Sequence, residues 1–194
     1  MSGSDASARL VVVKVGGSLF DLPDLGPRLR AWLARLSAAE VLLVPGGGPT
    51  ADVVRDLDRR HALGEEASHW LALRALTVNA HFLQALLPGA VVVPQPYGRG
   101  VLSVLDPYAF ARADEGRPGC LPHCWQVTSD SVAARAAVVG QARRLVLLKS
   151  ATIPQGLAWD EAGRCGLVDG WFARVLAQAS DPLTVSAVNF RDQP

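Results

Sequence analysis

Short apolar runs that stop at glycine turns alternate with segments of helical spacing in the first part of the chain. Leu10 to Val15 is a β-branched run that ends at a Gly-Gly-Ser turn, and Val41 to Val44 is a second run that ends at Pro-Gly-Gly-Gly-Pro. Such runs predict buried strands. Between them, apolar residues recur at helical spacing from Leu25 to Leu36, which predicts a helix.

Two helices and a third strand are expected next. Thr50 has the residue type of an N-cap and is expected to begin the first of these helices. The segment Glu65 to Leu86 predicts a long second helix, because its apolar residues fall roughly on one stripe and Pro-Gly follows it. Val91 to Val93 then predicts another buried strand.

The segment from Pro94 to Trp125 is rich in proline and glycine, which predicts an irregular excursion with a short strand at Val101 to Leu105. Connections of this length in compact domains are typically lids, binding loops or disordered segments. We therefore treat residues 94–126 as a candidate lid.

Regular structure is expected again from the Thr-Ser-Asp cluster at 128–130, whose residue types favour a helix N-terminus. The predicted elements are a helix over Ser131 to Ala142, a strand over Leu145 to Leu148, a helix over Trp171 to Ala179 and a strand over Leu183 to Val188. Buried apolar strands that alternate with helices predict an α/β fold whose mainly parallel sheet is covered on both faces.

Composition limits the classes of function. The chain has 194 residues, 49% of them apolar, which is expected of one globular domain over residues 9–194 behind a flexible N-terminus at 1–8. Its 19 basic and 18 acidic residues leave a net charge of +1, which argues against nucleic-acid binding and a polybasic membrane anchor. A small-molecule partner is expected instead.

The sequence also gives an expected location. The longest apolar stretch that we find, Ala85 to Pro94, is about half of what a membrane span needs, and the first residues lack the features of a secretory signal. Three cysteines form no disulfide framework, which favours a cytoplasmic protein with reduced thiols. Cys120, His123 and Cys124 supply at most three of the four ligands that a zinc site needs, so we predict no metal centre there.

Lysine is rare in this chain. Among the 19 basic residues, only Lys14 and Lys149 are lysine. Lysine is a compact point charge that fits beside one phosphoryl oxygen, whereas arginine is a wide planar fork. The two lysines are therefore candidates for positions where arginine fails, and a chance result of a bias toward arginine is the alternative.

Two glycine turns follow the first two predicted strands. They are Gly16-Gly17-Ser18 and Gly46-Gly47-Gly48. In an open α/β sheet, such turns at the carboxyl ends of strands present unpaired N–H groups that bind phosphate. Neither turn belongs to a G-x-G-x-x-G or G-x-x-x-x-G-K-[ST] motif, which argues against a dinucleotide fold and a P-loop. Tight strand-to-helix corners use glycine as well.

Three charged residues are predicted to meet at the same edge of the sheet. Lys14 precedes the first glycine turn, Lys149 directly follows a strand, and Asp130 lies at a helix N-terminus. Phosphoryl transfer needs mainly positioning and positive charge around the equatorial oxygens. The lysines supply that charge, and the carboxylate holds them in place or helps to bind magnesium. A plain helix N-cap is the alternative for Asp130.

Four strings in this order resemble the amino acid kinase family. They are VVVKVGGSLF at 11–20, VLLVPGGGPTADVVR at 41–55, TSDSVAARAA at 128–137 and LVLLKS at 145–150. The resemblance implies a three-layer αβα sandwich, ATP and Mg2+ as cofactors, and a phosphoryl group held by the first glycine loop and its lysine. It implies that Lys14 is the catalytic lysine and that Asp130 is the organising aspartate.

The resemblance further implies that Gly16, Gly17, Gly46 and Gly47 cradle phosphate, and we add neighbouring residues and Lys149 to the predicted site. We predict phosphate or nucleotide binding by Gly16, Gly17, Ser18, Gly46, Gly47, Gly48 and Ser150, and a catalytic role for Lys149. The family's later glycine-rich segment with a further lysine is not found after Lys149, so a non-catalytic storage or regulatory protein that binds nucleotide or oxyanion is the alternative. The family also implies assembly into a homo-oligomer.

A smaller group within that family shares further features with this chain. The short length, the His69-Trp70 pair and the Trp-x-x-Thr-Ser-Asp string at 125–130 resemble aspartokinase-like proteins linked to methanofuran synthesis. The resemblance implies phosphorylation of (5-(aminomethyl)furan-3-yl)methyl phosphate to its diphosphate. For substrate binding we single out Arg99 as a cation for the acceptor phosphate, Trp125 for stacking on its ring, and Ser129. An exposed loop arginine and a core tryptophan are the alternatives.

Overall fold

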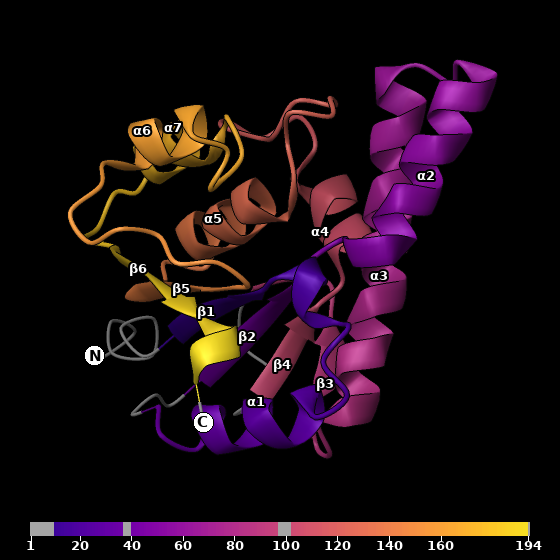
Figure 1. The fold of residues 1–194 in the computed structure, drawn as a ribbon. Helices are drawn as coiled ribbons and strands as arrows, with labels where there is room; N and C mark the ends of the chain where they lie inside the picture. Colours follow the sequence, from indigo (N-terminus) through magenta and orange to yellow (C-terminus); the bar gives the residue numbers. More distant parts are fainter. Residues whose placement is uncertain (1–9, 37–39, 97–101, 194) are drawn as a thin grey trace.

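The computed structural model describes residues 10–36, 40–96 and 102–193 and contains one sheet of six strands (Figure 1). The strands are β1 (Leu10–Val15), β2 (Glu40–Pro45), β3 (Val91–Val93), β4 (Leu102–Leu105), β5 (Arg144–Lys149) and β6 (Thr184–Asn189). Their order is β3-β4-β2-β1-β5-β6, and every neighbouring pair is parallel. The prediction of a mainly parallel α/β sheet is confirmed.

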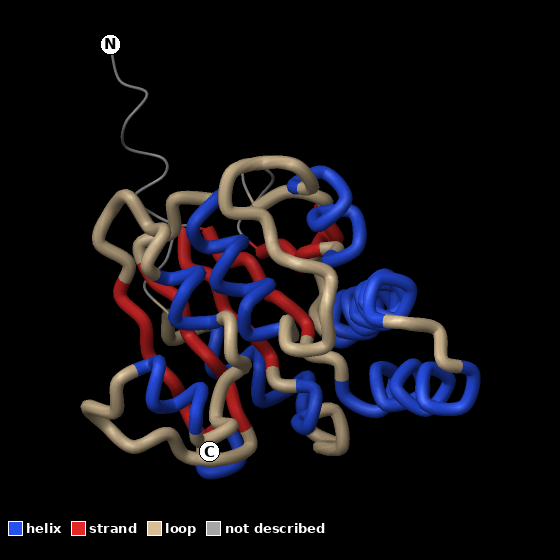
Figure 2. Tube along the Cα trace, turned by 90° about the horizontal axis from the view of Figure 1, so that it is seen from above, coloured by secondary structure: helices blue, strands red, loops and turns tan. Residues whose placement is uncertain are grey.

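Helices cover both faces of this sheet, which gives the expected three layers (Figures 1 and 2). They are α1 (Leu25–Leu33), α2 (Gly48–His61), α3 (Glu65–Leu86), α4 (Pro107–Asp114), α5 (Ser129–Val139), α6 (Trp159–Arg164) and α7 (Phe172–Leu176). One core cluster joins the sheet to α4, α5, α6 and α7, and the other joins it to α1 and the second half of α3. The helices α2 and α3 lie side by side at one side of the molecule (Figures 1 and 2).

The period of two in β1 decides where its lysine points. Leu10 and Val12 belong to the core cluster beneath α5, whereas Val11 and Val13 belong to the opposite cluster with α1. Because successive side chains alternate between faces, Lys14 lies on the α5 face. The same alternation in β5 places Lys149 on that face, two positions after Leu147.

Strand order explains why the two lysines meet. The chain runs from β1 to its neighbour β2 on one side, and β5 later pairs with β1 on the other side. A crevice forms outside the carboxyl ends of strands where the order switches in this way. Lys14 and Lys149 lie near the ends of the two strands that flank this switch point.

Several boundaries differ from the prediction for identifiable reasons. Helix α4 interrupts the predicted irregular segment: Asp106 caps it by accepting a hydrogen bond from the Ala109 amide at 3.1 Å, and Pro107 occupies its first turn. Helix α6 lies between the strand predicted at 145–148 and the helix predicted at 171–179, where no element was predicted. Thr50 is not an N-cap, because α2 begins at Gly48 with Gly47 before it.

Two predicted helices differ in length. Helix α5 starts at Ser129, two residues before the predicted start, and ends at Val139. Thr128 is its N-cap, so Asp130 stands in the first turn and the simple N-cap interpretation of Asp130 is wrong. Helix α7 has only five residues, fewer than the predicted segment. No helix in the described part of the chain has the length and apolar character that a membrane crossing requires.

Candidate active site

Asp130 lies between the two lysines of the chain. Its Oδ1 is 2.9 Å from Lys14 Nζ, and its Oδ2 is 2.9 Å from Lys149 Nζ. The side chains of Lys14 and Asp130 are almost fully buried, at 6% and 7% exposure, whereas that of Lys149 is 18% exposed. Two ammonium groups against one carboxylate leave the cluster net positive, and Lys149 is its most accessible member.

Burial and the neighbouring charges act against each other in this cluster. Burial by itself raises the pKa of the Asp130 carboxyl, but the ammonium groups of Lys14 and Lys149 outweigh it and hold that pKa below its ordinary value. For Lys149, burial and the charge of Lys14 lower the pKa more than Asp130 raises it. Asp130 therefore stays ionised at neutral pH and keeps two like charges together.

The two glycine turns pack backbone against backbone. A Cβ added to Gly17 would collide with the backbone of Gly48, and a Cβ added to Gly46 would collide with the backbone of Gly17. Gly48 also has a positive φ of 53°, a region in which residues with side chains are strained. The contact between the turns therefore requires glycine.

The N–H groups of the turns divide into two sets. Gly16 donates to the Leu148 carbonyl and Gly46 donates to the Val15 carbonyl, each at 2.8 Å, so these N–H groups are not available to a phosphate. Gly17 and Ser18 begin a short 3-10 helix (Gly17–Leu19) and Gly48 begins α2, so their N–H groups have no intrahelical acceptor. The first set shapes the cradle, and the second set can donate into it.

Asn79 of α3 holds the second glycine turn from behind. Its buried amide donates to the carbonyls of Gly46 and Gly47 at 2.8 and 2.7 Å. The Thr50 hydroxyl lies 2.9 Å from Asn79 Oδ1 and 2.6 Å from the Gly47 carbonyl. The helix α3 thus sets the height of this turn above the sheet.

The first glycine turn also contacts the end of β5. The hydroxyls of Ser18 and Ser150 lie 2.8 Å apart. These two residues come from positions 132 apart in the sequence, and both were predicted as phosphate or nucleotide ligands. Together with the ion-paired cluster, this contact shows that both lysine-bearing strand ends lie beside the same turn.

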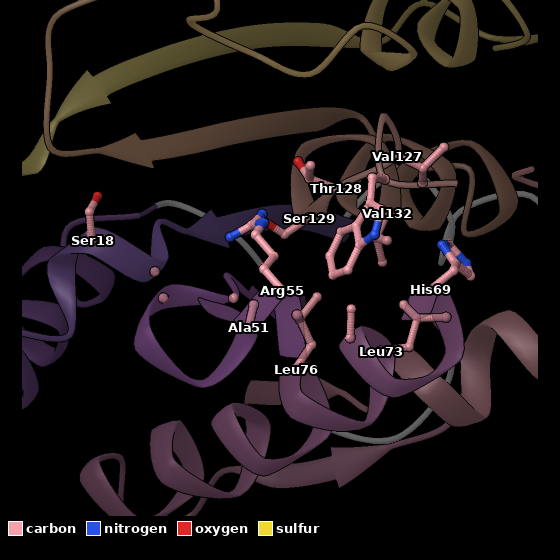
Figure 3. Close-up of a pocket in the computed structure, with 15 residues that line it drawn as sticks. Ser18, Ala51, Arg55, His69, Leu73, Leu76, Val127, Thr128, Ser129 and Val132 are labelled. Carbon is pink, nitrogen blue, oxygen red and sulfur yellow. The ribbon is translucent and has the colours of Figure 1, made fainter. Parts of the chain in front are cut away.

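A pocket of about 210 Å³ opens beside the glycine turns. Gly17, Ser18, Gly47 and Gly48 line one part of it, and Trp125 and Ser129 line another, so the pocket gathers six of the predicted site residues. Figure 3 shows Ser18 at one end and His69 at the other, with Leu73 and Leu76 of α3 forming one apolar wall.

The rim of the pocket carries a cation that the sequence analysis missed. Arg55 of α2 lines the pocket, and its guanidinium lies 5.3 Å from the centre of the Trp125 ring. Trp125 in turn donates from Nε1 to Asp58 Oδ2 at 2.7 Å, which ties the segment before α5 to α2. Arg99, the predicted cation for the acceptor, lies outside the described residues.

His69 faces the pocket as a neutral group. Burial, and then the charge of His123, lower its pKa from 6.5 to about 4, against a backbone hydrogen bond at Cys124 that raises it. The two imidazole rings stack with centroids 5.2 Å apart. At neutral pH His69 can donate or accept one hydrogen bond, but it brings no charge to a ligand.

Magnesium fits this site only together with phosphates. Within residues 10–36, 40–96 and 102–193, no group of three or more His, Cys, Asp or Glu side chains is placed to hold a metal ion. Both Asp130 oxygens already face ammonium groups. Mg2+ is commonly held by one or two carboxylates plus substrate phosphates, so with both Asp130 oxygens paired the bound phosphates would supply most of its donors here.

The sequence of this chain matches the model of a known protein family over most of its length. A model of the amino acid kinase family matches residues 9–152. A (5-(aminomethyl)furan-3-yl)methyl phosphate kinase from Methanocaldococcus jannaschii is 35% identical over 66 residues, which make up 34% of this chain. That match spans only 30% of the length of the relative.

Solved structures of similar fold cover nearly the whole chain. Uridylate kinase from Archaeoglobus fulgidus superimposes with a TM-score of 0.64 at 16% identity, over 94% of this chain and 92% of that one. UMP kinase from Bacillus anthracis gives 0.65 at 16% identity, over 95% and 88%. Aspartate kinase from Synechocystis gives 0.61 at 14% identity, over 96% of this chain and 39% of that one. At these identities the likeness concerns the fold.

Proposed function

The chain belongs to the amino acid kinase family, and from this we propose that it transfers the γ-phosphoryl group of ATP to a small-molecule acceptor. The observation that carries the proposal is the Asp130 carboxylate between Lys14 and Lys149, beside two glycine turns in backbone contact. A net positive cluster next to free N–H groups is suited to a phosphoryl group that carries charge on its equatorial oxygens.

Each residue has a distinct task in the proposed reaction. An acceptor oxygen forms a bond to the γ-phosphorus while the bond from that phosphorus to the bridging oxygen breaks and ADP leaves. Lys14 and Lys149 neutralise the charge on the group in transit, and Asp130 fixes the position of both ammonium groups. The N–H groups of Gly17 and Ser18 hold phosphoryl oxygens. When bound with ATP, Mg2+ supplies further positive charge to the phosphates.

The acceptor that the pocket suits best is a phosphate monoester with a small flat ring. Arg55 supplies a cation at the rim, the Trp125 ring supplies a stacking surface, and α3 supplies an apolar wall. (5-(Aminomethyl)furan-3-yl)methyl phosphate, the substrate in the name of the partial relative, has this chemistry. We propose it as the acceptor, with the diphosphate as product.

We also propose that the active form is a homo-oligomer in the cytoplasm, where ATP is available. Leu71, Val78 and Phe82 lie on one side of α3 with 38%, 59% and 39% exposure. Val53 and Leu57 of the neighbouring α2 are 60% and 42% exposed. A second copy that covers these side chains would remove them from water.

Calorimetric titration and an ADP-release assay test the proposal together. We expect Mg-ATP to bind the wild type, and ADP to form only when the furan phosphate is added. Binding of ATP without turnover on the phosphorylated acceptor, or on its unphosphorylated alcohol and simple phosphate monoesters, would instead favour a storage or regulatory protein. Absence of any nucleotide binding would contradict the kinase proposal.

A further inference from the structure

Asp169, in the segment between α6 and α7, accepts hydrogen bonds from six donors. Its Oδ2 accepts from the Thr128 amide at 3.0 Å, the Thr128 hydroxyl at 2.8 Å and the Ser131 amide at 2.9 Å. Its Oδ1 accepts from the Ser131 hydroxyl and from the amides of Trp171 and Phe172, the last two at 3.1 Å each. One carboxylate therefore joins the first turn of α5 to the first turn of α7.

These contacts lie on both sides of Asp130 in the sequence. Thr128 precedes Asp130 by two residues and Ser131 follows it directly, and both bond to the same carboxylate. The N-cap residue Thr128 makes no hydrogen bond from its side chain to its own helix. The usual task of an N-cap side chain is thus performed by a residue from a distant segment.

A first turn that carries a buried carboxylate needs to be held in place. We call the set of hydrogen bonds that Asp169 accepts from this turn and from α7 the anchor. Asp130 can bridge two ammonium groups only while α5 begins at one fixed height above β1 and β5. The first turn of a helix frays most readily, because its N–H groups lack intrahelical acceptors. A negative charge at that end also opposes fraying through the helix dipole.

We propose that Asp169 is a positioning residue of the reaction: it anchors the first turn of α5 and thereby holds Asp130 between Lys14 and Lys149. The inference rests on the proposed kinase function for its effect on turnover, although the anchor itself does not depend on it. Asp169 forms no hydrogen bond or ion pair with Lys14 or Lys149, so it fixes their geometry through Asp130, while its charge also raises the pKa of Lys149 from a distance.

The anchor requires a carboxylate. All six partners of Asp169 are donors, three on each oxygen. Asparagine would place an NH2 group against three donors in either orientation of its amide, because that group cannot accept a hydrogen bond. Asp169→Asn therefore removes half of the anchor without changing the size of the side chain.

Asp114, the last residue of α4, provides a matched control because it tethers the same helix α5. It is buried and pairs with Arg135 in the middle of α5, at 2.7 Å from Nε and 2.9 Å from Nη2. Asp114→Asn makes the same chemical change and also weakens a tether of α5, but at Arg135 in the middle of the helix and not in the first turn that carries Asp130. If Asp169 contributed only to the stability of the protein, Asp169→Asn and Asp114→Asn would lower kcat to a similar extent.

Steady-state kinetics separates the two explanations. We expect Asp169→Asn to lower kcat by about ten- to a hundredfold, the range in which a displacement of about 1 Å acts, with KM for ATP and acceptor within about threefold of wild type. Asp114→Asn is expected to keep kcat within threefold below its melting temperature. Equal kcat values for Asp169→Asn and wild type, or equal losses in both variants, would overturn the proposal.

Two additions keep the test decisive if Asp169→Asn folds poorly or the wild type shows no kinase activity. Ser131→Ala removes the hydroxyl bond only and is expected to lower kcat by a few-fold. Amide hydrogen exchange in Asp169→Asn is expected to rise selectively at residues 128–132 relative to 133–139, whatever the reaction is. Unchanged exchange at 128–132 would overturn the anchor, whereas inactive wild type with raised exchange would refute only the kinase function.

Discussion

The ion-paired cluster and the rim of the pocket are built in different ways. Lys14, Asp130 and Lys149 are held by strand ends, by a helix terminus and by each other, and two of the three side chains are below 10% exposure. At the rim, Arg55 is 48% exposed and pairs with Asp52 on its own helix. Salt bridges of that kind contribute little to stability.

The difference indicates that the cluster and the rim have separate roles in the proposed reaction. A buried network in which each Asp130 oxygen faces one ammonium group keeps the charges in one geometry, which is what transition-state stabilisation requires. An exposed arginine beside a tryptophan can adjust to a ligand and can be exchanged at small cost to the fold. We therefore expect substitutions in the cluster to change kcat and substitutions at the rim to change KM.

The largest effect is expected for Lys14→Ala. Removing the buried ammonium group should lower kcat on the order of a thousandfold, as the loss of a positive group at a transferring phosphoryl does elsewhere. Lys14→Arg should also be poor, since a planar fork does not replace a compact charge at a buried site. Turnover within tenfold of wild type in Lys14→Ala, with an unchanged circular dichroism spectrum, would exclude the cluster as the reaction centre.

The next effect is expected for Gly17→Ala. Its methyl group would meet the backbone of Gly48, so the two turns must separate, and kcat should fall by about ten- to a hundredfold. Gly163→Ala is the matched control, because its nearest contact would be an ordinary one at 3.6 Å. Similar kinetics and melting temperatures for the two variants would show that the contact between the turns is unimportant.

A smaller effect at the rim is expected for Arg55→Gln. A charged hydrogen bond from a partly exposed arginine is worth about 1.4 kcal/mol, which corresponds to a tenfold rise in KM for the phosphorylated acceptor with kcat nearly unchanged. Arg59→Gln is the control, since Arg59 forms a similar pair with Asp56 on α2 but does not line the pocket. A large loss of kcat in Arg55→Gln would contradict the expectation that substitutions at the rim change KM and leave kcat nearly unchanged.

The smallest effect concerns pH. Folded His69 has a pKa of about 4, below the ordinary value of 6.5, so the unfolded chain binds a proton first as the pH falls. The free energy of unfolding should therefore decrease between pH 6.5 and 4, and less so in His69→Gln. Urea titrations at several pH values measure this, with His81→Gln at an exposed position as control. Parallel pH profiles for His69→Gln and wild type would refute the assignment.

The sheet and the ion-paired cluster could be predicted because each depends on local patterns. Buried runs locate strands, and the carboxyl ends of parallel strands share one edge, so Lys14, Asp130 and Lys149 had to approach one another. The start of α4 was predictable too, since Asp106 followed by Pro107 is a helix-start signal within a segment that proline content marked as irregular.

The supporting residues depend on contacts between distant segments. Asp169 bonds to residues about 40 positions earlier in the chain, and Asn79 reaches back more than 30 positions to the second glycine turn. Asp169 precedes the helix predicted at Trp171, where an Asp is typical of a cap, but nothing in the neighbouring sequence marks its contact with α5 or the contact of Asn79 with the turn. Arg55 is one of 17 arginines, and only the packing of α2 beside the pocket distinguishes it.

The most direct test of the cluster as a phosphoryl-transfer centre follows the phosphorus atoms themselves. Wild type and Lys14→Ala are incubated with Mg-ATP and (5-(aminomethyl)furan-3-yl)methyl phosphate, and the mixtures are observed by 31P NMR. With wild type alone we predict loss of the γ-phosphate signal of ATP, loss of the monoester signal of the acceptor, and a second coupled diphosphate pair beside that of ADP. Unchanged ATP in the presence of acceptor, or equal product from Lys14→Ala, would contradict the account.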